Sequence, residues 1–216
     1  MATKGSAVPE GVIERLPAYL NCLMDLEEER VATVSSQRMS DLTGINAAEI
    51  RRDLVHFGSF GIKGVGYDVK SLAGRIQKIL GSDKPHRIAL VGAGNLGSAI
   101  AKYDGLRKHG FEIAAIFDKD PARIGKRLGA TLIHHPKEID QVIGHHGIYM
   151  AIVAVPPDAA QRTVDQLAAA GVKVILNYTS ARVTAPDGVQ VHNSDPVNEL
   201  LYTLYYLRSR KQVPEG

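Results

Sequence analysis

The feature that most constrains this chain is a glycine-rich turn between a strand-like segment and a helix-like one. His86 to Val91 is a run of apolar and β-forming residues, and it leads directly into Gly92-Ala93-Gly94-Asn95-Leu96-Gly97. Apolar residues then recur at helical spacing up to Tyr103. A G-x-G-x-x-G sequence alone is weak evidence, but with a strand before it and a helix after it, it predicts the phosphate-binding turn of a Rossmann unit.

Each glycine has a separate role in such a turn. Gly92 permits the tight bend, Gly94 lets the backbone approach a pyrophosphate, and Gly97 lets the helix pack closely against the strand. The phosphates of a dinucleotide then lie at the amino end of the helix, where free N–H groups and the helix dipole favour negative charge. The turn from Gly92 to Gly97 is therefore predicted to bind a dinucleotide.

An acidic residue follows at the spacing that such a site requires. The second strand, Phe111 to Phe117, ends at Asp118, 21 residues after Gly97. A carboxylate in this place accepts hydrogen bonds from both ribose hydroxyls and repels a 2′-phosphate, so NAD(H) is favoured over its phosphorylated form. Lys119 weakens that repulsion slightly. The alternative is an aspartate that only caps a helix beginning at Pro121.

Strand-like and helix-like segments continue to alternate after Asp118. We expect strands at Ala130 to His134, Ile148 to Val155, Val172 to Asn177 and Val189 to His192, and helices at Lys137 to Ile143 and Asp158 to Ala170. This alternation predicts an α/β fold with a doubly wound parallel sheet. Val155 and Pro156, at the end of the fourth strand, are expected to wall the nicotinamide side of the crevice.

The length of the chain limits what can accompany this sheet. Of 216 residues, 44% are hydrophobic and 23% are charged, as in globular proteins. Residues 81–86 are rich in turn-forming and polar types, which is typical of an inter-domain linker. We therefore expect an N-terminal domain over residues 1–84, a Rossmann domain over 85–195 and a C-terminal helix and tail over 196–216.

Composition disfavours several functional classes. The longest apolar run, Ile148 to Pro157, is too short to cross a bilayer, and the N-terminus lacks a signal-like stretch, so we expect a soluble, cytoplasmic protein without membrane contact. Cys22 is the single cysteine and lies in an apolar helical pattern, typical of a buried thiol. His134-His135 and His145-His146 lack metal-ligand spacing and are expected in loops, so we predict no metal site. A net charge of +3 permits binding to nucleic acid but does not require it.

The first 84 residues show helical spacing without convincing strand alternation. Ser35 or Ser36 is expected to cap a short helix that ends at Gly44, and Asn46 to Glu49 resembles a capping box that opens the next one. Two short helices joined by three residues have the layout of a helix-turn-helix. A longer helix precedes them, with an apolar stripe formed by Val12, Ile13, Leu16, Tyr19, Leu20, Leu23 and Leu26. The inward residues of the short helix are expected to be Met39 and Leu42.

The outward face of the second short helix is the candidate DNA contact. Ile50, Leu54 and Phe57 share its inward face. The opposite face is formed by Ala47, Ala48, Arg51, Arg52, Val55 and His56. Small alanines would let the helix enter a major groove, and the arginines would reach base edges or phosphates, whereas Asp53 is expected to orient an arginine. The alternative is an ordinary helical hairpin with a solvated face.

A glycine-rich segment follows this helix. Phe57 to Tyr67 contains four glycines among alternating apolar residues, which predicts a small hairpin. Behind a recognition helix such a hairpin is a wing, whose basic tip, Lys63, would lie beside the DNA backbone or minor groove. The alternative is a flexible loop. A further helix ending at Gly81 would close the domain, with inward residues Val69, Leu72, Ile76, Ile79 and Leu80.

The crevice lacks the groups expected of a dehydrogenase. The sequence contains no Tyr-x-x-x-Lys pair, since Tyr103 is followed at that spacing by Arg107, and about 110 residues of sheet leave no domain to supply a substrate pocket with a positioned acid or base. We therefore expect no catalytic residue and a nucleotide that is sensed rather than converted. Two rivals stay open: a small NAD-dependent oxidoreductase whose N-terminal helices only dimerise, and a nucleotide- or coenzyme A-binding subunit of a larger complex.

A set of short sequences along nearly the whole chain points to one family. They are Ser35-Ser36-Gln37, Leu42-Thr43-Gly44, Asn46-Ala47-Ala48, Arg52-Asp53-Leu54, Phe57-Gly58-Ser59-Phe60-Gly61, Gly64-Val65-Gly66-Tyr67, the run from Ala89 to Gly97, Phe117-Asp118, Asp120-Pro121 and Ile175-Leu176-Asn177. Together they resemble the Rex family of bacterial redox-sensing repressors. The resemblance implies a winged helix-turn-helix domain, a Rossmann domain and a C-terminal helix, Pro196 to Arg210, that swaps across a homodimer. It also implies an A/T-rich inverted-repeat operator of double-stranded DNA, release by NADH and competition by NAD⁺.

The resemblance further implies roles for single positions. Tyr103 and Asp195 would join the cofactor site, and together with Arg15 they would be the polar residues whose pairing changes with the nucleotide state. The DNA contacts would be Ser36, Asn46, Ala47, Ala48, Arg51, Arg52, His56, Ser59, Lys63 and Gly64. The chain departs from the family's pattern at His56, at Ser194, at Pro196 and over Tyr178 to Ala181. These departures concern the nicotinamide contact and the preference for reduced cofactor, not the fold.

The C-terminal helix is more apolar than a solvent-facing terminus. Its large side chains include Leu200, Leu201, Tyr202, Leu204, Tyr205, Tyr206 and Leu207. This composition independently favours burial against a partner.

Overall fold

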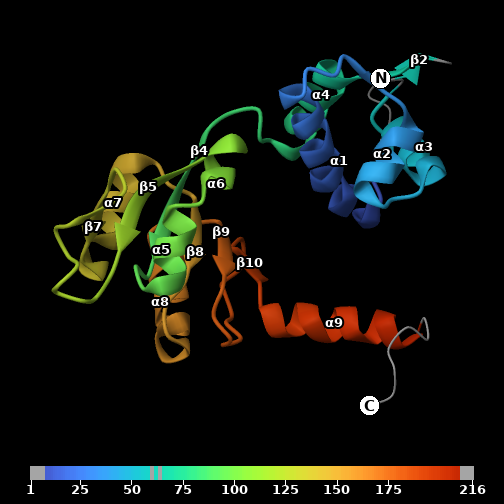
Figure 1. The fold of residues 1–216 in the computed structure, drawn as a ribbon. Coiled ribbons are helices and arrows are strands. Elements are labelled where there is room, and N and C mark those ends of the chain that lie inside the picture. Colours follow the sequence, from blue (N-terminus) through green and yellow to red (C-terminus); the bar gives the residue numbers. More distant parts are fainter. Residues whose placement is uncertain (1–7, 59–60, 63–64, 210–216) are drawn as a thin grey trace, which may run out of the picture. The chain divides into compact units, whose positions relative to one another are not determined.

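The computed structural model describes residues 8–58, 61–62 and 65–209 of the chain. Two compact units are present, Met1–Lys84 and Pro85–Gly216, and the boundary between them lies within residues 81–86. Figure 1 traces the elements of both units along the chain. No helix in the described ranges is long and apolar enough to cross a membrane.

The N-terminal unit combines four helices with a small antiparallel sheet in the part of the chain that the structure describes. Its elements are α1 (Glu10–Glu28), β1 (Thr33–Val34), α2 (Ser36–Thr43), α3 (Ala47–Val55), β2 (Gly61–Ile62), β3 (Gly66–Asp68) and α4 (Val69–Leu80). The strand order is β1-β3-β2, so the predicted hairpin is confirmed and β1 extends it. The sequence does not predict β1, because two residues are too few to show an alternating pattern.

Capping side chains set the ends of α2 and α3. Ser35 Oγ accepts a hydrogen bond from the Arg38 N–H at 3.0 Å, and Asn46 Oδ1 accepts one from the Ala48 N–H at 2.8 Å. Gly44 ends α2 in the left-handed conformation, with a φ of 73°. The predicted three-residue turn between the two helices is confirmed.

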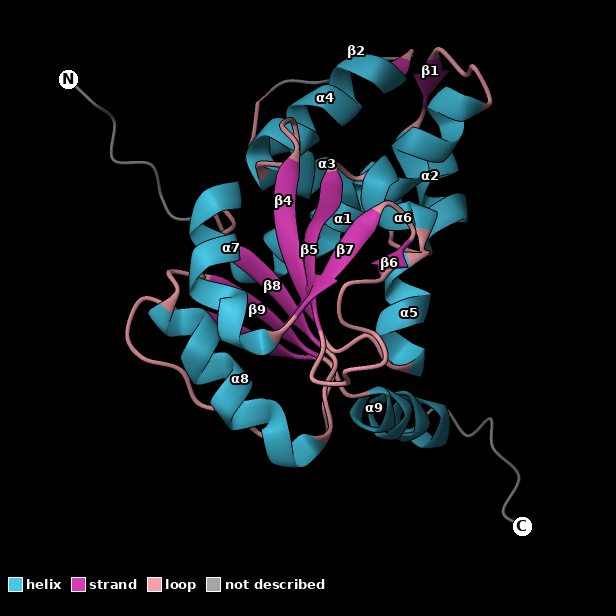
Figure 2. Ribbon diagram, turned by 90° about the vertical axis from the view of Figure 1, so that its left-hand side faces the viewer, coloured by secondary structure: helices cyan, strands magenta, loops and turns pink. Residues whose placement is uncertain are grey.

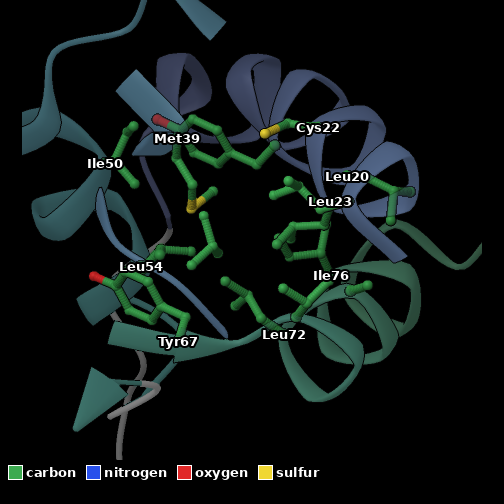
Figure 3. Close-up of a cluster of buried hydrophobic side chains, with 14 of the residues drawn as sticks. Leu20, Cys22, Leu23, Met39, Ile50, Leu54, Tyr67, Leu72 and Ile76 are labelled. Atoms are coloured by element: carbon green, nitrogen blue, oxygen red, sulfur yellow. The ribbon is translucent and has the colours of Figure 1, made fainter. Parts of the chain in front are cut away.

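The core of this unit lies between α1, α3 and α4, with α2 contributing Met39 (Figure 3). Its fully buried side chains include Leu16, Tyr19, Leu23, Met39, Ile50, Leu54, Leu72 and Ile76, and Cys22 is buried as predicted. Three residues predicted to face inward, Ile13, Leu42 and Ile79, are instead exposed. They lie at the margins of their helices, where a core this small does not reach.

Gly66, in β3, lets the hairpin approach β1 closely. Its φ is +104°, and a Cβ at this position would overlap the carbonyl oxygen of Val34. The glycine is therefore required by the close approach of two strands, and not only by the turn.

The second unit is a seven-stranded sheet covered on both faces. Its elements are β4 (His86–Val91), α5 (Asn95–Ala101), α6 (Asp104–Lys108), β5 (Phe111–Phe117), β6 (Arg127–Leu128), β7 (Thr131–His134), η1 (Pro136–Glu138), α7 (Ile139–His146), β8 (Met150–Val153), α8 (Pro157–Ala169), β9 (Val174–Asn177), β10 (Gln190–Asn193) and α9 (Pro196–Ser209). The strand order is β10-β9-β8-β4-β5-β7-β6, and every pairing is parallel except that of β6 with β7. The predicted doubly wound parallel sheet is confirmed.

Alternate residues of β4 point to opposite faces of this sheet. Ala89 and Val91 pack in the cluster that contains the buried residues of α7 and α8, whereas Ile88 and Leu90 pack in the cluster against which α5 and α6 lie. Figure 2 shows these helix pairs on the two sides of the strands. Burial on both faces explains the continuous apolar run from which the strand was predicted.

Three local predictions in this unit are wrong. No helix begins at Pro121, because residues 121–125 form turns. Three of the four paired histidines are not loop residues: His134 ends β7 and His145-His146 end α7, whereas His135 lies between β7 and η1 as expected. The fourth strand is shorter than Ile148 to Val155, since Ala154 to Pro156 leave the sheet to line the crevice described below.

Large apolar side chains of α9 are exposed in the single chain. They are Val197, Leu200, Leu201, Tyr202, Leu204 and Tyr205, with 42–69% of each residue accessible. The side chains of Tyr206 and Leu207 lie outside the described part.

Candidate nucleotide site and DNA-binding surface

The glycine turn has the geometry that its sequence predicts. Gly92 has a φ of +102°, and a Cβ there would overlap the carbonyl oxygen of Ala154 at the end of β8. A Cβ at Gly97 would overlap the carbonyl oxygen of Gly92. The turn therefore brings α5 against β4, and β8 against the turn, as closely as backbone atoms allow.

A crevice of about 840 Å³ opens at the carboxyl ends of β4, β5 and β8. This volume is in the range of small-molecule sites, and the position is the topological switch point of the sheet, where ligands of such folds bind. Six of the predicted cofactor residues line it: Gly92, Gly94, Asp118, Lys119, Val155 and Pro156.

The other predicted cofactor residues lie elsewhere. Ala93 and Gly97 are buried in the turn beneath the crevice, and Asn95 and Leu96 are exposed on the first turn of α5. Tyr103 is 68% exposed at the start of α6 and does not line the crevice.

Asp118 is buried and already hydrogen-bonded. Its Oδ2 accepts the Ala93 N–H at 2.7 Å and pairs with Arg123 Nη1 at 3.1 Å, and its Oδ1 accepts the Asp120 N–H at 2.9 Å. Burial raises the pKa of this carboxyl group, but the hydrogen bonds from Asp120 and Ala93 and the charge of Arg123 outweigh burial and hold its pKa below the usual value. The carboxylate thus remains charged, and its hydrogen bonds connect the turn after β5 to the glycine turn.

These contacts alter the expectation for the ribose. An ionised carboxylate offers about four lone-pair sites, and three are used, so Asp118 has about one left for a ribose hydroxyl instead of two. The sequence analysis did not single out Arg123. The sequence offered one indication of its role: Arg123 follows Asp118 by five residues, in a segment that has to turn back at the end of the strand.

Arg15 is bound within the N-terminal unit. Its Nε and Nη2 donate to the two oxygens of Asp53 at 2.7 and 2.8 Å, and Tyr19 donates to Asp53 Oδ2 at 2.6 Å. Glu49 pairs with Arg15 Nη1 at 3.1 Å, and for this reason it does not complete the predicted capping box with Asn46. The prediction that Asp53 orients an arginine is confirmed, and the arginine is Arg15 of α1.

The electrostatics of this cluster favour the ion pair. Asp53 is 3% exposed, and burial raises the pKa of its carboxyl group, but hydrogen bonds from Arg15 and Tyr19 outweigh burial and lower that pKa. Asp53 in turn raises the pKa of Arg15 through its hydrogen bond. Burial, followed by the bond to Asp53, raises the pKa of the Tyr19 hydroxyl. All three groups therefore keep their ordinary charge state near neutrality, with α3 tied to α1.

Asp195, the third of the predicted switch residues, lies at the start of α9. Its Oδ1 accepts the Val197 N–H at 3.0 Å, and its Oδ2 accepts a side-chain N–H of Asn198 at 3.3 Å. Arg15 belongs to one unit and Tyr103 and Asp195 to the other. Their pairing therefore stays a prediction.

The exposed face of α3, with its two cap residues, carries five of the ten predicted DNA contacts. Ala48, Arg51, Arg52 and His56 are exposed there, as is the cap residue Asn46. Arg51 Nη1 donates to Ser36 Oγ at 2.8 Å, which holds the guanidinium against the first residue of α2. One placement is wrong: Ala47 is only 9% exposed, because the first turn of α3 packs into the domain. Ser59, Lys63 and Gly64 lie outside the described residues.

Two family models match parts of the chain. "CoA binding domain" matches residues 83–181, and "Putative DNA-binding protein N-terminus" matches residues 7–54. The first covers the glycine turn and strands β4 to β9, and the second covers α1, α2 and most of α3.

Curated relatives match over most of their length. The redox-sensing transcriptional repressor Rex of Chloroflexus aurantiacus is 44% identical over 204 residues, covering 94% of this chain and 96% of that protein. The Rex repressor of Streptomyces avermitilis is 41% identical over 199 residues, covering 92% of this chain and 79% of that protein.

Solved structures match over both units. A crystal structure of RSP in complex with β-NAD⁺ and operator DNA has a TM-score of 0.85 at 36% identity, covering 95% of each chain. A crystal structure of RSP in complex with β-NADH has a TM-score of 0.82 at 34% identity, covering 95% of this chain and 97% of that one. With this identity and coverage, the chain belongs to the Rex family of redox-sensing transcriptional repressors.

Proposed function

We propose that this protein is a transcriptional repressor that binds operator DNA and is released by NADH, so that it responds to the NADH/NAD⁺ ratio. The observation that carries the proposal is the presence, in one chain, of a winged helix-turn-helix unit and a dinucleotide crevice. Relatives solved with NAD⁺ and operator DNA, and with NADH, support it.

The residues of the crevice fit a dinucleotide. Gly92 and Gly97 allow the close packing of the turn, and Gly94 has no side chain to keep a pyrophosphate from the backbone. Asp118 would accept a ribose hydroxyl, and Val155 with Pro156 would form the wall on the nicotinamide side. The nicotinamide ring carries the hydride that distinguishes the reduced from the oxidised cofactor. We propose that the protein senses this difference and does not catalyse hydride transfer.

The exposed face of α3 fits a major groove. Ala48 is small and lies in the first turn of α3, where recognition helices contact base edges, and Arg51 follows it on the exposed face, held by Ser36 of α2. Lys63, which lies outside the described residues, is proposed from the sequence to contact the DNA backbone.

We propose that the protein acts as a homodimer in the cytoplasm, where its operator DNA lies. The exposed apolar side chains of α9 need a partner surface, and a second copy of the chain supplies one. A two-fold dimer presents two copies of α3, which match the halves of an inverted repeat about 34 Å apart.

NADH would act by a shift in population. If it binds one arrangement of the winged units better, and that arrangement cannot place both α3 helices in successive major grooves, NADH lowers operator affinity. Linkage then requires operator DNA to weaken NADH binding by the same factor.

The test is a fluorescence-anisotropy titration of the full-length protein on a labelled A/T-rich inverted-repeat duplex, with NADH, with NAD⁺ and without nucleotide. We expect tight binding without NADH, release by NADH, and recovery when excess NAD⁺ is added. A shuffled duplex is the control for non-specific binding. Retention of the duplex at saturating NADH would contradict the proposal, and steady NADH oxidation with small carbonyl compounds would favour the oxidoreductase.

A further inference from the structure

Asn177 is a fully buried polar residue at the carboxyl end of β9. Its Oδ1 accepts the Thr179 N–H at 3.1 Å, and its Nδ2 donates to the Ala181 carbonyl at 3.0 Å and to Asn193 Oδ1 at 2.8 Å. An amide carries two donors and an acceptor, so it satisfies these three partners together, whereas a carboxylate lacks the donors and an aliphatic side chain lacks both kinds of group. The buried position therefore requires an amide.

The loop that Asn177 holds lies on the nicotinamide side of the crevice. The adenosine end is expected at β5, on one side of β4, and the nicotinamide end at Val155 after β8, on the other side. Because β9 is the next strand beyond β8, residues 178–181 continue the carboxyl edge of the sheet away from the adenosine end. The Tyr178 N–H donates to the Val153 carbonyl at 2.9 Å, which holds the start of this loop beside the end of β8.

The other partner of Asn177 leads to α9. Asn193 is the exposed last residue of β10, and the Ser194 N–H that follows it donates to the Asn177 carbonyl at 2.8 Å. Asp195 comes next, and its carboxylate accepts the Val197 N–H at 3.0 Å and so caps the first turn of α9. The side chain of Asn193 is thus located where the sheet joins α9.

We infer that the hydrogen bond between Asn177 and Asn193 is a positioning contact that couples the nicotinamide end of the crevice to the start of α9. One NH₂ group binds the loop through Ala181 and the strand before α9 through Asn193, so a nucleotide that displaces the loop also alters the contact to α9. Both asparagines are positioning residues, which act through the loop. The inference rests on the proposed function, because it takes α9 to belong to the dimer whose arrangement NADH changes.

The exposure of Asn193 separates coupling from stability. When its side chain is removed, water reaches this edge of the sheet and accepts the hydrogen bond that Asn177 Nδ2 has lost, so the buried amide keeps a partner. A water molecule satisfies the donor but does not transmit a movement of the loop to β10. The loss should therefore change the response to NADH and leave the free energy of unfolding nearly unchanged.

The test measures a release factor, defined as the operator dissociation constant at saturating NADH divided by that without nucleotide. Fluorescence anisotropy of the full-length protein on the labelled inverted-repeat duplex gives this factor for the wild type, Asn193→Ala, Asn193→Asp and Gln190→Ala. Asn193→Asp keeps an oxygen that accepts from Asn177. Gln190→Ala removes an exposed amide from the other end of β10 and is the matched control.

Asn193→Ala should lower the release factor by about two- to tenfold, the range for one lost hydrogen bond. Linkage requires the same reduction in the factor by which operator DNA weakens NADH binding, which calorimetry of the free and the operator-bound protein measures independently. Asn193→Asp should keep most of the release factor, and Gln190→Ala should keep all of it. Operator binding without nucleotide and the melting temperature should stay near the wild-type values in all three variants.

The inference is wrong if Asn193→Ala shows the wild-type release factor. It is also wrong if Asn193→Asp or Gln190→Ala loses as much of the factor as Asn193→Ala does. A purely structural role predicts a third contrary result, in which Asn193→Ala lowers the melting temperature and weakens NADH binding and operator binding alike. Failure of the proposed function is a separate outcome, seen in the wild-type protein alone as an operator that stays bound at saturating NADH.

Discussion

Asp53 illustrates how a single side chain can connect the recognition helix to the rest of its domain. It lies on the buried face of α3, and its carboxylate takes two hydrogen bonds from Arg15 and one from Tyr19, both on α1. Arg15 and Tyr19 are four residues apart and so share one face of their helix. A buried carboxylate without these partners would be costly, and the cluster therefore specifies how α3 sits on α1.

The first prediction concerns Arg15. Arg15→Met should lower the free energy of unfolding by about 2–3 kcal/mol, because Asp53 stays buried with one partner fewer. Glu49→Gln is the control, since it removes only the partly exposed pair with Arg15 and should cost less than about 1 kcal/mol. Urea unfolding of both variants measures the difference, and equal losses would mean that the buried pair does not stabilise the domain.

The second prediction concerns pH. Because the folded pKa of Asp53 lies below its usual value of 3.8, its contribution to stability is complete above that pH and is lost as the pH falls through the folded pKa. The stability difference between the wild-type protein and Asp53→Asn should therefore be constant near neutrality and shrink below about pH 4. Urea unfolding between about pH 3 and pH 7 tests this, and a difference that does not change with pH would contradict it.

At the level of elements, backbone atoms set how closely α5 approaches the end of β4. Gly97 is buried on the first turn of α5 where any side chain would meet the Gly92 carbonyl, and Gly92 is itself held against β8. The spacing of these glycines was visible in the sequence because no other residue fits either position. The role of Arg123 was not predicted, because it depends on how the turn after β5 brings the guanidinium to Asp118.

The third prediction concerns this contact. Gly97→Ala should push α5 away from β4, lower the free energy of unfolding by about 1–3 kcal/mol and weaken NADH binding. The control is Gly144→Ala in α7, where a Cβ meets nothing within 4 Å and should stabilise the helix by about 0.5–1 kcal/mol. Thermal unfolding and calorimetry with NADH give both quantities. NADH binding by Gly97→Ala equal to the wild type would show that the nucleotide does not use this turn.

The fourth prediction concerns α3. Arg51→Ala should weaken binding to the operator by about 1–3 kcal/mol and relax the preference for base sequence, since the guanidinium is held where it can reach base edges. Ser36→Ala, which removes the hydrogen bond to Arg51 and the predicted DNA contact of Ser36 itself but leaves the Arg51 guanidinium in place, should show a smaller loss in the same direction. Anisotropy titrations on the operator and on single-base variants compare them. Identical binding by Arg51→Ala and the wild type would remove Arg51 from the interface.

At the scale of the whole molecule, each unit has its own core, and α9 exposes apolar side chains that neither core covers. Such a surface is unfavourable in water, so the single chain is an incomplete assembly under the proposed function. Coupling between nucleotide and DNA must then pass through contacts that the assembled protein makes.

The fifth prediction belongs to this scale. Leu201→Lys on α9 should shift the protein from dimer to monomer and reduce operator binding, because a charge would have to be buried in the interface. Leu132→Lys, a change of the same kind at an exposed residue of β7, is the control. Light scattering coupled to size-exclusion chromatography gives the mass. A dimeric Leu201→Lys protein with normal operator binding would show that this part of α9 is not the interface.

The sequence by itself determined the order of the longer elements, the doubly wound sheet, the glycine turn and the turn between α2 and α3. These features follow from local rules: residue spacing, capping side chains and positions that only glycine tolerates. The tertiary structure decided which side chains pair across the fold, such as Arg15 with Asp53 and Arg123 with Asp118, and which apolar residues stay exposed, such as Leu42. These contacts join residues that only the packing of the fold brings together. A local sequence pattern does not show in which direction a long, flexible side chain points or with which charged group it pairs.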